Sequence, residues 1–299
     1  MLPKKVKIVE VSPRDGLQNE KQVIELSTKL ELIQRLQDSG LKNIEITGFV
    51  SPKWIPQLAE SEQLCQKLQR HTGINYSALT PNLKGMEKAV AAGLQEVAVF
   101  TAASESFTKK NINCSIEESL QRFVPVIELA KQHDIKVRGY VSCVLGCPYE
   151  GEISADKVAE VTEKLFQLGC YEVSLGDTIG TGTPRKAHEM FKSCQQIADT
   201  QYLALHFHNT YGQALANIYA CMELGSEIID SSVAGLGGCP YAKGASGNVA
   251  TEDVIYMLNG MNIECGINLE KLVETGNWIS EKLNRLNNSQ VGKALNNSQ

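Results

Sequence analysis

The sequence alternates between short apolar runs and longer amphipathic segments from its beginning almost to its end. The runs are rich in β-branched residues and recur roughly every 30 residues, and the segments between them have helical periodicity. Strands are therefore predicted at residues 6–11, 43–49, 75–80, 96–101, 136–141, 171–175, 203–207 and 228–233. Strands that alternate with helices indicate a parallel sheet with helical crossover connections.

The helices have recognisable faces and ends. Residues 116–133, for example, place Leu120, Val124, Ile127 and Ala130 on one face. Several predicted helices end at a glycine that lies close to the following strand and can adopt a left-handed turn. These glycines are Gly40, Gly93, Gly169 and Gly225.

Eight evenly spaced strand–helix units favour a closed barrel over an open doubly wound sheet. The predicted fold is therefore α/β, a (β/α)8 TIM barrel, and barrels of ~250 residues fold as one domain. We expect the barrel to span residues 1–286 as a single catalytic domain, with a short additional helical or tail region at the C-terminus. The polar tail 287–299, which follows Leu286 and contains the string NNSQ twice, is expected to fray.

The bulk composition narrows the possible partners and location. A net charge of −5 argues against nucleic acid or an anionic membrane as partner, and no apolar run approaches the ~20 residues that span a bilayer. Nine scattered cysteines, an odd number, argue against a disulfide framework and are interpreted mostly as buried apolar residues. With neither a signal peptide nor an arginine-rich leader recognised, the expected location is cytoplasmic.

Polar residues at the carboxyl ends of the predicted strands are the candidate functional groups, because barrels of this kind place their catalytic residues there. His206 and His208 are two apart on one strand, so both side chains point to the same face. Two inward imidazoles make half of a metal site, which an acidic or amide group must complete. Two core histidines are the alternative, but Asp15 and Asp177 at other strand ends favour a metal.

Arg14 and Asp15 follow the first strand, and Glu45 lies inside the second. The Arg14–Asp15 pair could be a solvated ion pair. At the mouth of a barrel, however, the aspartate can ligate a cation and the guanidinium can stabilise a developing oxyanion. Glu45 is costly to bury unless it is paired, so we expect it to bind Arg14 or a lysine, and the Arg14 pairing could hold that side chain in place.

A glycine-rich loop with Cys239 in its middle follows the last predicted strand, between Gly235 and Asn248. It could be a phosphate-binding nest, an ordinary connection or a mobile lid. A lid could deliver the Cys239 thiol to a closed site as a proton donor. The residues alone leave these three readings open.

Several of these motifs together resemble the 3-hydroxy-3-methylglutaryl-CoA (HMG-CoA) lyases, of a superfamily of barrel aldolases and acyl-CoA synthases. The resemblance runs from about Val6 to Leu286. It rests on VSPRDGLQNEK at Val11–Lys21, VAGLGGCPYAKGASGN at Val233–Asn248, FVSPKW at Phe49–Trp54 and RGYVSC at Arg138–Cys143. The glycine-rich loop is the most specific of these motifs, because the Arg-Asp-Gly motif is shared with the wider superfamily.

The resemblance implies cleavage of HMG-CoA, a small acyl-CoA substrate, to acetoacetate and acetyl-CoA by a homodimer with Mg²⁺ or Mn²⁺. Arg14 would bind the substrate and steady its thioester enolate, and Cys239 would take part in acid–base steps. The implied metal ligands are Asp15, His206, His208 and Asn248. The implied catalytic or supporting acidic residues are Glu45, Asp177 and Glu252. The rivals are a lyase for another 3-hydroxyacyl-CoA, a synthase that condenses acetyl-CoA with a 2-oxo acid, and a barrel that binds such ligands without catalysis.

Overall fold

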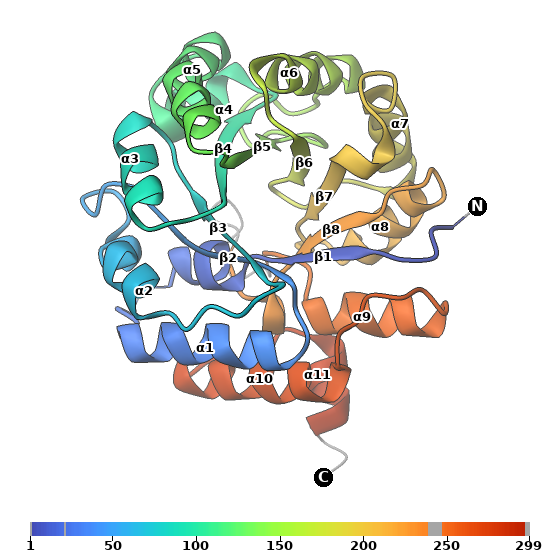
Figure 1. Cartoon of the computed structure of the whole chain (residues 1–299). Helices are drawn as coiled ribbons and strands as arrows, with labels where there is room; N and C mark the ends of the chain where they lie inside the picture. The colour runs from blue at the N-terminus through green and yellow to red at the C-terminus, as the bar shows by residue number, and fades with distance from the viewer. Residues whose placement is uncertain (1, 21, 239–246, 297–299) are drawn as a thin grey trace.

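The structure, a computed structural model, describes residues 2–20, 22–238 and 247–296 of the protein. Its strands are β1 Lys7–Glu10, β2 Asn43–Gly48, β3 Asn75–Leu79, β4 Glu96–Ala102, β5 Lys136–Ser142, β6 Glu172–Asp177, β7 Leu203–Phe207 and β8 Ile228–Ser231. Each strand pairs in parallel with the next, and β1 also pairs with β8. The predicted closed (β/α)8 barrel is thereby confirmed (Figure 1).

Helices surround the barrel as a ring (Figure 1). They are α1 Leu26–Asp38, α2 Ser61–Lys67, α3 Leu83–Ala91, α4 Glu105–Ile112, α5 Ile116–Gln132, α6 Ala155–Leu168, α7 Pro184–Cys194, α8 Ala214–Met222, α9 Thr251–Gly260, α10 Leu269–Lys282 and α11 Gln290–Asn296. Short helical turns η1 Ser12–Gly16, η2 Pro56–Leu58, η3 Thr200–Tyr202 and η4 Val233–Gly235 lie in the connections. Of the described helices, none is long and apolar enough to cross a membrane.

Local sequence explains where these helices begin and end. Helix α5 begins with a capping box, in which Ser115 and Glu118 satisfy each other's backbone amides. Its buried face includes Leu120, Phe123 and Ile127, which pack onto the barrel core. The glycines predicted to stop helices all have the positive φ that such a turn requires: Gly40, Gly93, Gly169 and Gly225.

The C-terminal region, expected to be helical or a tail, contains the short helix α11. Helix α11 packs against α9 and α10, and Asp253 on α9 accepts hydrogen bonds from Ser289 Oγ at 2.7 Å and from the backbone amide of Val291 at 2.9 Å. Within the tail, Gln290–Asn296 is helical, and the buried Asp253 carboxylate caps the start of this helix. Residues 297–299 lie outside the described part.

The predicted burial of the cysteines holds for those that the structure describes. Eight are described and all are free; seven are buried, and Cys265 is partly buried.

Candidate active site

Arg14 and Asp15 enter the barrel mouth on η1, a single π-helical turn directly after β1. The amides of Asp15 and Gly16 both bond to the carbonyl of Val11, which tightens the turn. Gly16 is required for close packing, because a Cβ there would lie 2.8 Å from Ser232 Oγ and 2.9 Å from Leu236 Cβ. This contact seats η1 against the segment that follows β8.

Arg14 is held between two carboxylates. Its Nε donates to Glu45 Oε2 at 2.6 Å and its Nη1 donates to Asp15 Oδ1 at 2.9 Å. Arg14 and Glu45 are both buried, so the expected pairing of Glu45 is confirmed. The two bonds fix the plane of the guanidinium, which also lies over the Tyr140 ring at 5.7 Å.

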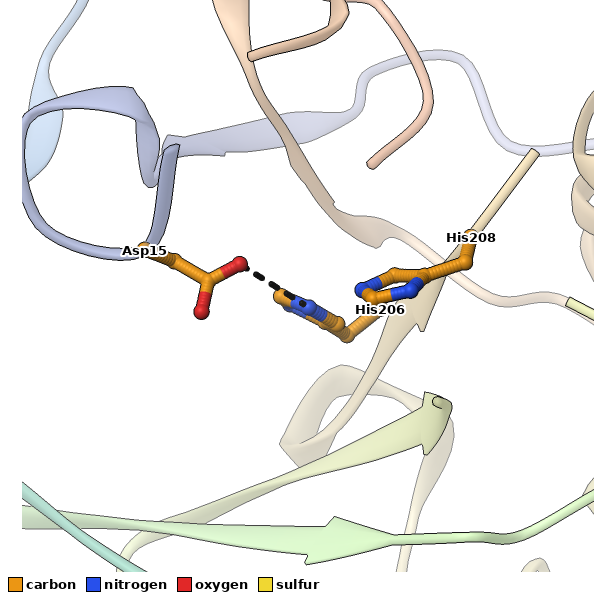
Figure 2. Close-up of side chains that lie close together, drawn as sticks. All are labelled: Asp15, His206 and His208. Carbon is orange, nitrogen blue, oxygen red and sulfur yellow. Dashed lines mark ion pairs between the residues drawn. The ribbon is translucent and has the colours of Figure 1, made fainter. Parts of the chain in front are cut away.

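His206 on β7 and His208, directly after that strand, meet Asp15 at the carboxyl end of the strands. Figure 2 shows the three side chains pointing toward one another, from η1 on one side and β7 on the other. One ligand atom from each of Asp15, His206 and His208 lies within 4.8 Å of the others. Within this cluster, His206 Nε2 is 3.9 Å from Asp15 Oδ2. These two nitrogens and a carboxylate have the composition of a metal-binding set.

Asn248 reaches the same place because its segment pairs with the end of β7. His208 and Asn248 form an antiparallel bridge, and the amide of Val249 bonds to the carbonyl of Phe207 at 3.1 Å. The Asn248 amide nitrogen donates to Asp15 Oδ2 at 2.7 Å and to the Leu236 carbonyl at 3.1 Å. Because both neighbours are acceptors, the NH2 group must face them, which leaves the amide oxygen for another ligand.

The protonation states of the cluster suit a cation. Burial raises the pKa of Asp15, but Arg14, the two histidines and the Asn248 hydrogen bond outweigh it and lower that pKa to about 2. Burial, together with nearby His206, lowers the pKa of His208 to about 4. Asp15 is therefore ionised and His208 neutral near pH 7, as metal ligands must be.

Asp177 lies at the end of β6 but is not part of the ligand cluster. Its Oδ2 accepts the amide of Gly182 at 2.9 Å, and the side chain is fully buried. Burial raises its pKa to about 6, although amides of the following turn lower it. The carboxyl group therefore organises the β6–α7 connection beside the cluster.

Glu252 also stands away from the cluster. It lies in the first turn of α9, where both of its oxygens are 2.9 Å from the amide nitrogen of Ala234. Burial raises its pKa to about 8. Ala234 belongs to η4, so Glu252 supports the root of the glycine-rich loop rather than touching the metal-binding set.

The glycine-rich loop is described only at its two ends. Gly237 has a φ of +106°, and a Cβ there would lie 2.7 Å from the Asn248 amide nitrogen, so this position needs glycine. Cys239, predicted to act in acid–base steps, lies outside the described residues.

Family models, curated relatives and solved structures all relate this chain to the same family. The HMGL-like family matches residues 5–279. The chain belongs to this family. It is 59% identical to the mitochondrial hydroxymethylglutaryl-CoA lyase of Homo sapiens over 98% of this chain and 90% of that protein. The HMG-CoA lyase structure from Pseudomonas aeruginosa has 55% identity and a TM-score of 0.98, covering 100% of this chain and 99% of the other.

A more distant HMG-CoA lyase structure, from Acinetobacter baumannii, was solved in complex with coenzyme A and 3-methylmalate. It has 35% identity and a TM-score of 0.93, and the match covers 97% of this chain and 95% of that one. The membership of the HMGL-like family that the motifs suggested is thus confirmed, and the chain is an enzyme of the carbon–carbon lyase class.

Charged residues that the sequence motifs did not indicate lie beneath the cluster. On β8, Asp230 Oδ2 lies 3.2 Å from His206 Nδ1, and both Asp230 oxygens accept hydrogen bonds from Arg138 on β5. A charge inside an apolar strand, the signal that singled out Glu45, is also present at Asp230. Its partner depends on strand register, since His206 and Asp230 are opposite each other in the pairing of β7 with β8.

Proposed function

We propose that this protein cleaves HMG-CoA to acetoacetate and acetyl-CoA with the help of a divalent cation. The observation that carries the proposal is the juxtaposition of Arg14 with the Asp15–His206–His208 cluster. Similarity to HMG-CoA lyases over nearly the whole chain supports the same reaction.

The residues fit a cation bound by Asp15, His206, His208 and Asn248. The fit rests on an ionised carboxylate, a neutral His208 and an amide oxygen turned away from its two acceptor neighbours. When bound, the cation supplies Lewis acidity that lowers the pKa of the substrate's tertiary hydroxyl. Oxygen ligands from Asp15 and Asn248 support Mg²⁺ or Mn²⁺, although two imidazoles alone would suit a softer metal.

Arg14 is proposed to stabilise the charge that develops on the substrate. Loss of the hydroxyl proton allows the C2–C3 bond to break, which releases acetoacetate and leaves a thioester enolate. Glu45 and Asp15 hold the Arg14 guanidinium in a fixed plane, so no reorganisation is needed when the enolate oxygen becomes charged. Protonation of the enolate carbon then gives acetyl-CoA.

Asp15 and His206 are the candidate bases for the hydroxyl proton, and Cys239 is proposed to take part in acid–base steps by resemblance to the family. Asp177 and Glu252 are proposed to act indirectly, by holding the β6–α7 connection and the root of the glycine-rich loop. The proposed catalytic domain is residues 1–286.

Three further features belong to the same proposal. Resemblance to the family supports a homodimer and an acyl-CoA substrate, and the coenzyme A in the Acinetobacter structure agrees with the latter. The eight described cysteines are all free, which supports a reducing compartment such as the cytoplasm.

The competing reactions can be separated with one set of substrates. We expect HMG-CoA to yield acetoacetate and acetyl-CoA in equal amounts, and acetyl-CoA with 2-oxo acids to release no free coenzyme A. Release of coenzyme A in the second assay would indicate a synthase. Faster cleavage of a different 3-hydroxyacyl-CoA would retain the reaction class and reject the substrate.

A further inference from the structure

A buried polar network lies behind His206, on the side away from Asp15. Its centre is Asp230, whose side chain is fully enclosed. Asp230 Oδ2 is 3.2 Å from His206 Nδ1, whereas the other ring nitrogen, Nε2, is the one nearer Asp15 Oδ2. The His206 ring therefore has one nitrogen facing the network and one facing the ligand cluster.

Asp230 is held as a hydrogen-bond acceptor. Arg138 donates to both of its oxygens, from Nη1 to Oδ2 at 2.9 Å and from Nη2 to Oδ1 at 2.7 Å. Ser174 Oγ adds a bond to Oδ2 at 2.8 Å. A guanidinium stays protonated in proteins, and its two parallel bonds to Oδ1 and Oδ2 are the pairing of an arginine with an ionised carboxylate. An ionised carboxylate has no hydrogen to donate.

Arg138 is itself anchored from the opposite side. Its Nε donates to Glu172 Oε1 at 2.6 Å, and Lys7 Nζ donates to Glu172 Oε2 at 2.6 Å. Arg138 Nη1 also donates to the Tyr140 hydroxyl at 2.9 Å. The guanidinium cannot rotate toward another acceptor without breaking several bonds, so the Asp230 carboxylate keeps its position.

We propose that Asp230 is a positioning residue that fixes His206 in one tautomer. Because Asp230 can only accept, Nδ1 of a neutral His206 must carry the hydrogen, and the lone pair stands on Nε2, directed at the cation site. Arg138, anchored by Glu172, holds Asp230 for this task. Such outer partners of a ligating histidine orient the ring and raise its basicity. The inference rests on the metal site of the proposed function.

A purely structural role for Asp230 makes different predictions, and Glu96 supplies the matched control. Glu96 is also a buried carboxylate on a barrel strand, bonded to Asn75 Nδ2 at 2.7 Å and to the Tyr171 hydroxyl at 2.8 Å. It has no contact with the His206 ring among the described residues. Removing either carboxylate should lower the free energy of unfolding. Only removal of the Asp230 carboxylate should change the His206 tautomer and the affinity for the metal ion.

The first test is the nitrogen-15 NMR spectrum of the histidine rings in metal-free wild-type protein at about pH 8, where an ordinary imidazole is neutral. His206, assigned by its loss in His206→Gln, should show a protonated Nδ1 and an unprotonated Nε2. A hydrogen on Nε2, or an even mixture, would overturn the proposal. This test needs neither metal nor activity, and it stands if the variants below do not fold.

The second test compares the Mn²⁺ affinity of Asp230→Ala and Glu96→Ala, measured by electron paramagnetic resonance. We expect Asp230→Ala to bind Mn²⁺ roughly 10- to 100-fold more weakly and to show a mixture of His206 tautomers, with Glu96→Ala close to wild type. Equal affinities in the two folded variants would overturn the proposal. Failure of the wild-type protein to bind Mn²⁺ or cleave HMG-CoA would instead reject the proposed function, whatever the tautomer.

Discussion

At the scale of single residues, Arg14 connects the buried carboxylate of Glu45 to the ligand cluster through Asp15. It is buried, so its charge must be balanced, and Glu45 and Asp15 both do so at hydrogen-bonding distance. One of these partners is also a proposed metal ligand. The position of the guanidinium and that of the cation are therefore set by a shared carboxylate.

Replacing Arg14 by glutamine should lower turnover at least a hundredfold, because removal of a preorganised charge donor costs about 2.7–4 kcal/mol of barrier. Turnover and bound metal should be measured on the same preparation. Arg70→Gln is the control, since Arg70 is exposed and bonds only to the carbonyls of Ala92 and Gly93 among the described residues. Near-normal turnover in Arg14→Gln with unchanged metal content would reject the role of Arg14.

Asp177 gives a prediction for stability against pH. Its pKa is raised to about 6 in the folded protein, and an unfolded aspartate has a pKa of about 3.9. The unfolded state thus loses its proton first as pH rises, which favours unfolding. Wild type should lose roughly 2 kcal/mol of unfolding free energy relative to Asp177→Asn between pH ~4 and ~7, with most of the loss before pH ~6.

Urea unfolding of the metal-free wild type and of Asp177→Asn, at several pH values, measures this difference. A constant offset would only reflect the altered hydrogen bond to Gly182. If the difference in unfolding free energy does not change with pH, the carboxyl group is not protonated as the structure indicates.

At the scale of elements, η1 depends on a close contact with the chain that follows β8. Gly16→Ala would force its new methyl group against Ser232 and Leu236. We expect a loss of about 1–3 kcal/mol in the free energy of unfolding, and weaker metal binding because η1 carries Asp15. Gly260→Ala is the control, since a Cβ there meets nothing within 4 Å. Equal unfolding free energies in the two variants would show that the contact at Gly16 is unimportant.

The elements show what the sequence could and could not predict. The strand at residues 43–49 was expected and is found as β2 at Asn43–Gly48, because hydrophobic period and flanking glycines are local signals. Pairings between distant segments are not local. Asn248 was a candidate ligand only by family resemblance, and a bridge to His208 brings it to the site. The Asp230–His206 contact likewise requires the register of two strands.

The four acidic candidates illustrate the same limit within the site. Asp15 and Glu45 were predicted from their places at and within strands, and the structure brings both to Arg14. Asp177 and Glu252 lie near the same mouth but face backbone amides. A residue's position along the chain indicates which end of the barrel it occupies, whereas its direction depends on the turn that follows.

At the scale of the whole molecule, the charged residues that hold Asp230 and the charged residues of the candidate active site lie toward opposite ends of the barrel strands. Lys7 and Glu172 lie at the starts of β1 and β6, and Arg138 connects them to Asp230 deeper in the barrel. Asp15, His206 and Arg14 gather at the opposite, carboxyl end. A continuous chain of ion pairs and hydrogen bonds thus runs through the interior from the barrel floor to the cluster.

The central claim is metal-dependent cleavage of HMG-CoA, and the most direct measurement is acetoacetate release by the purified full-length protein. Protein stripped with a chelator should release none, and added Mg²⁺ or Mn²⁺ should restore turnover to on the order of 10 s⁻¹, typical of an efficient enzyme. Release that persists unchanged in chelator would contradict the role of the cation. No release from folded, reduced, metal-loaded protein would contradict the assigned substrate.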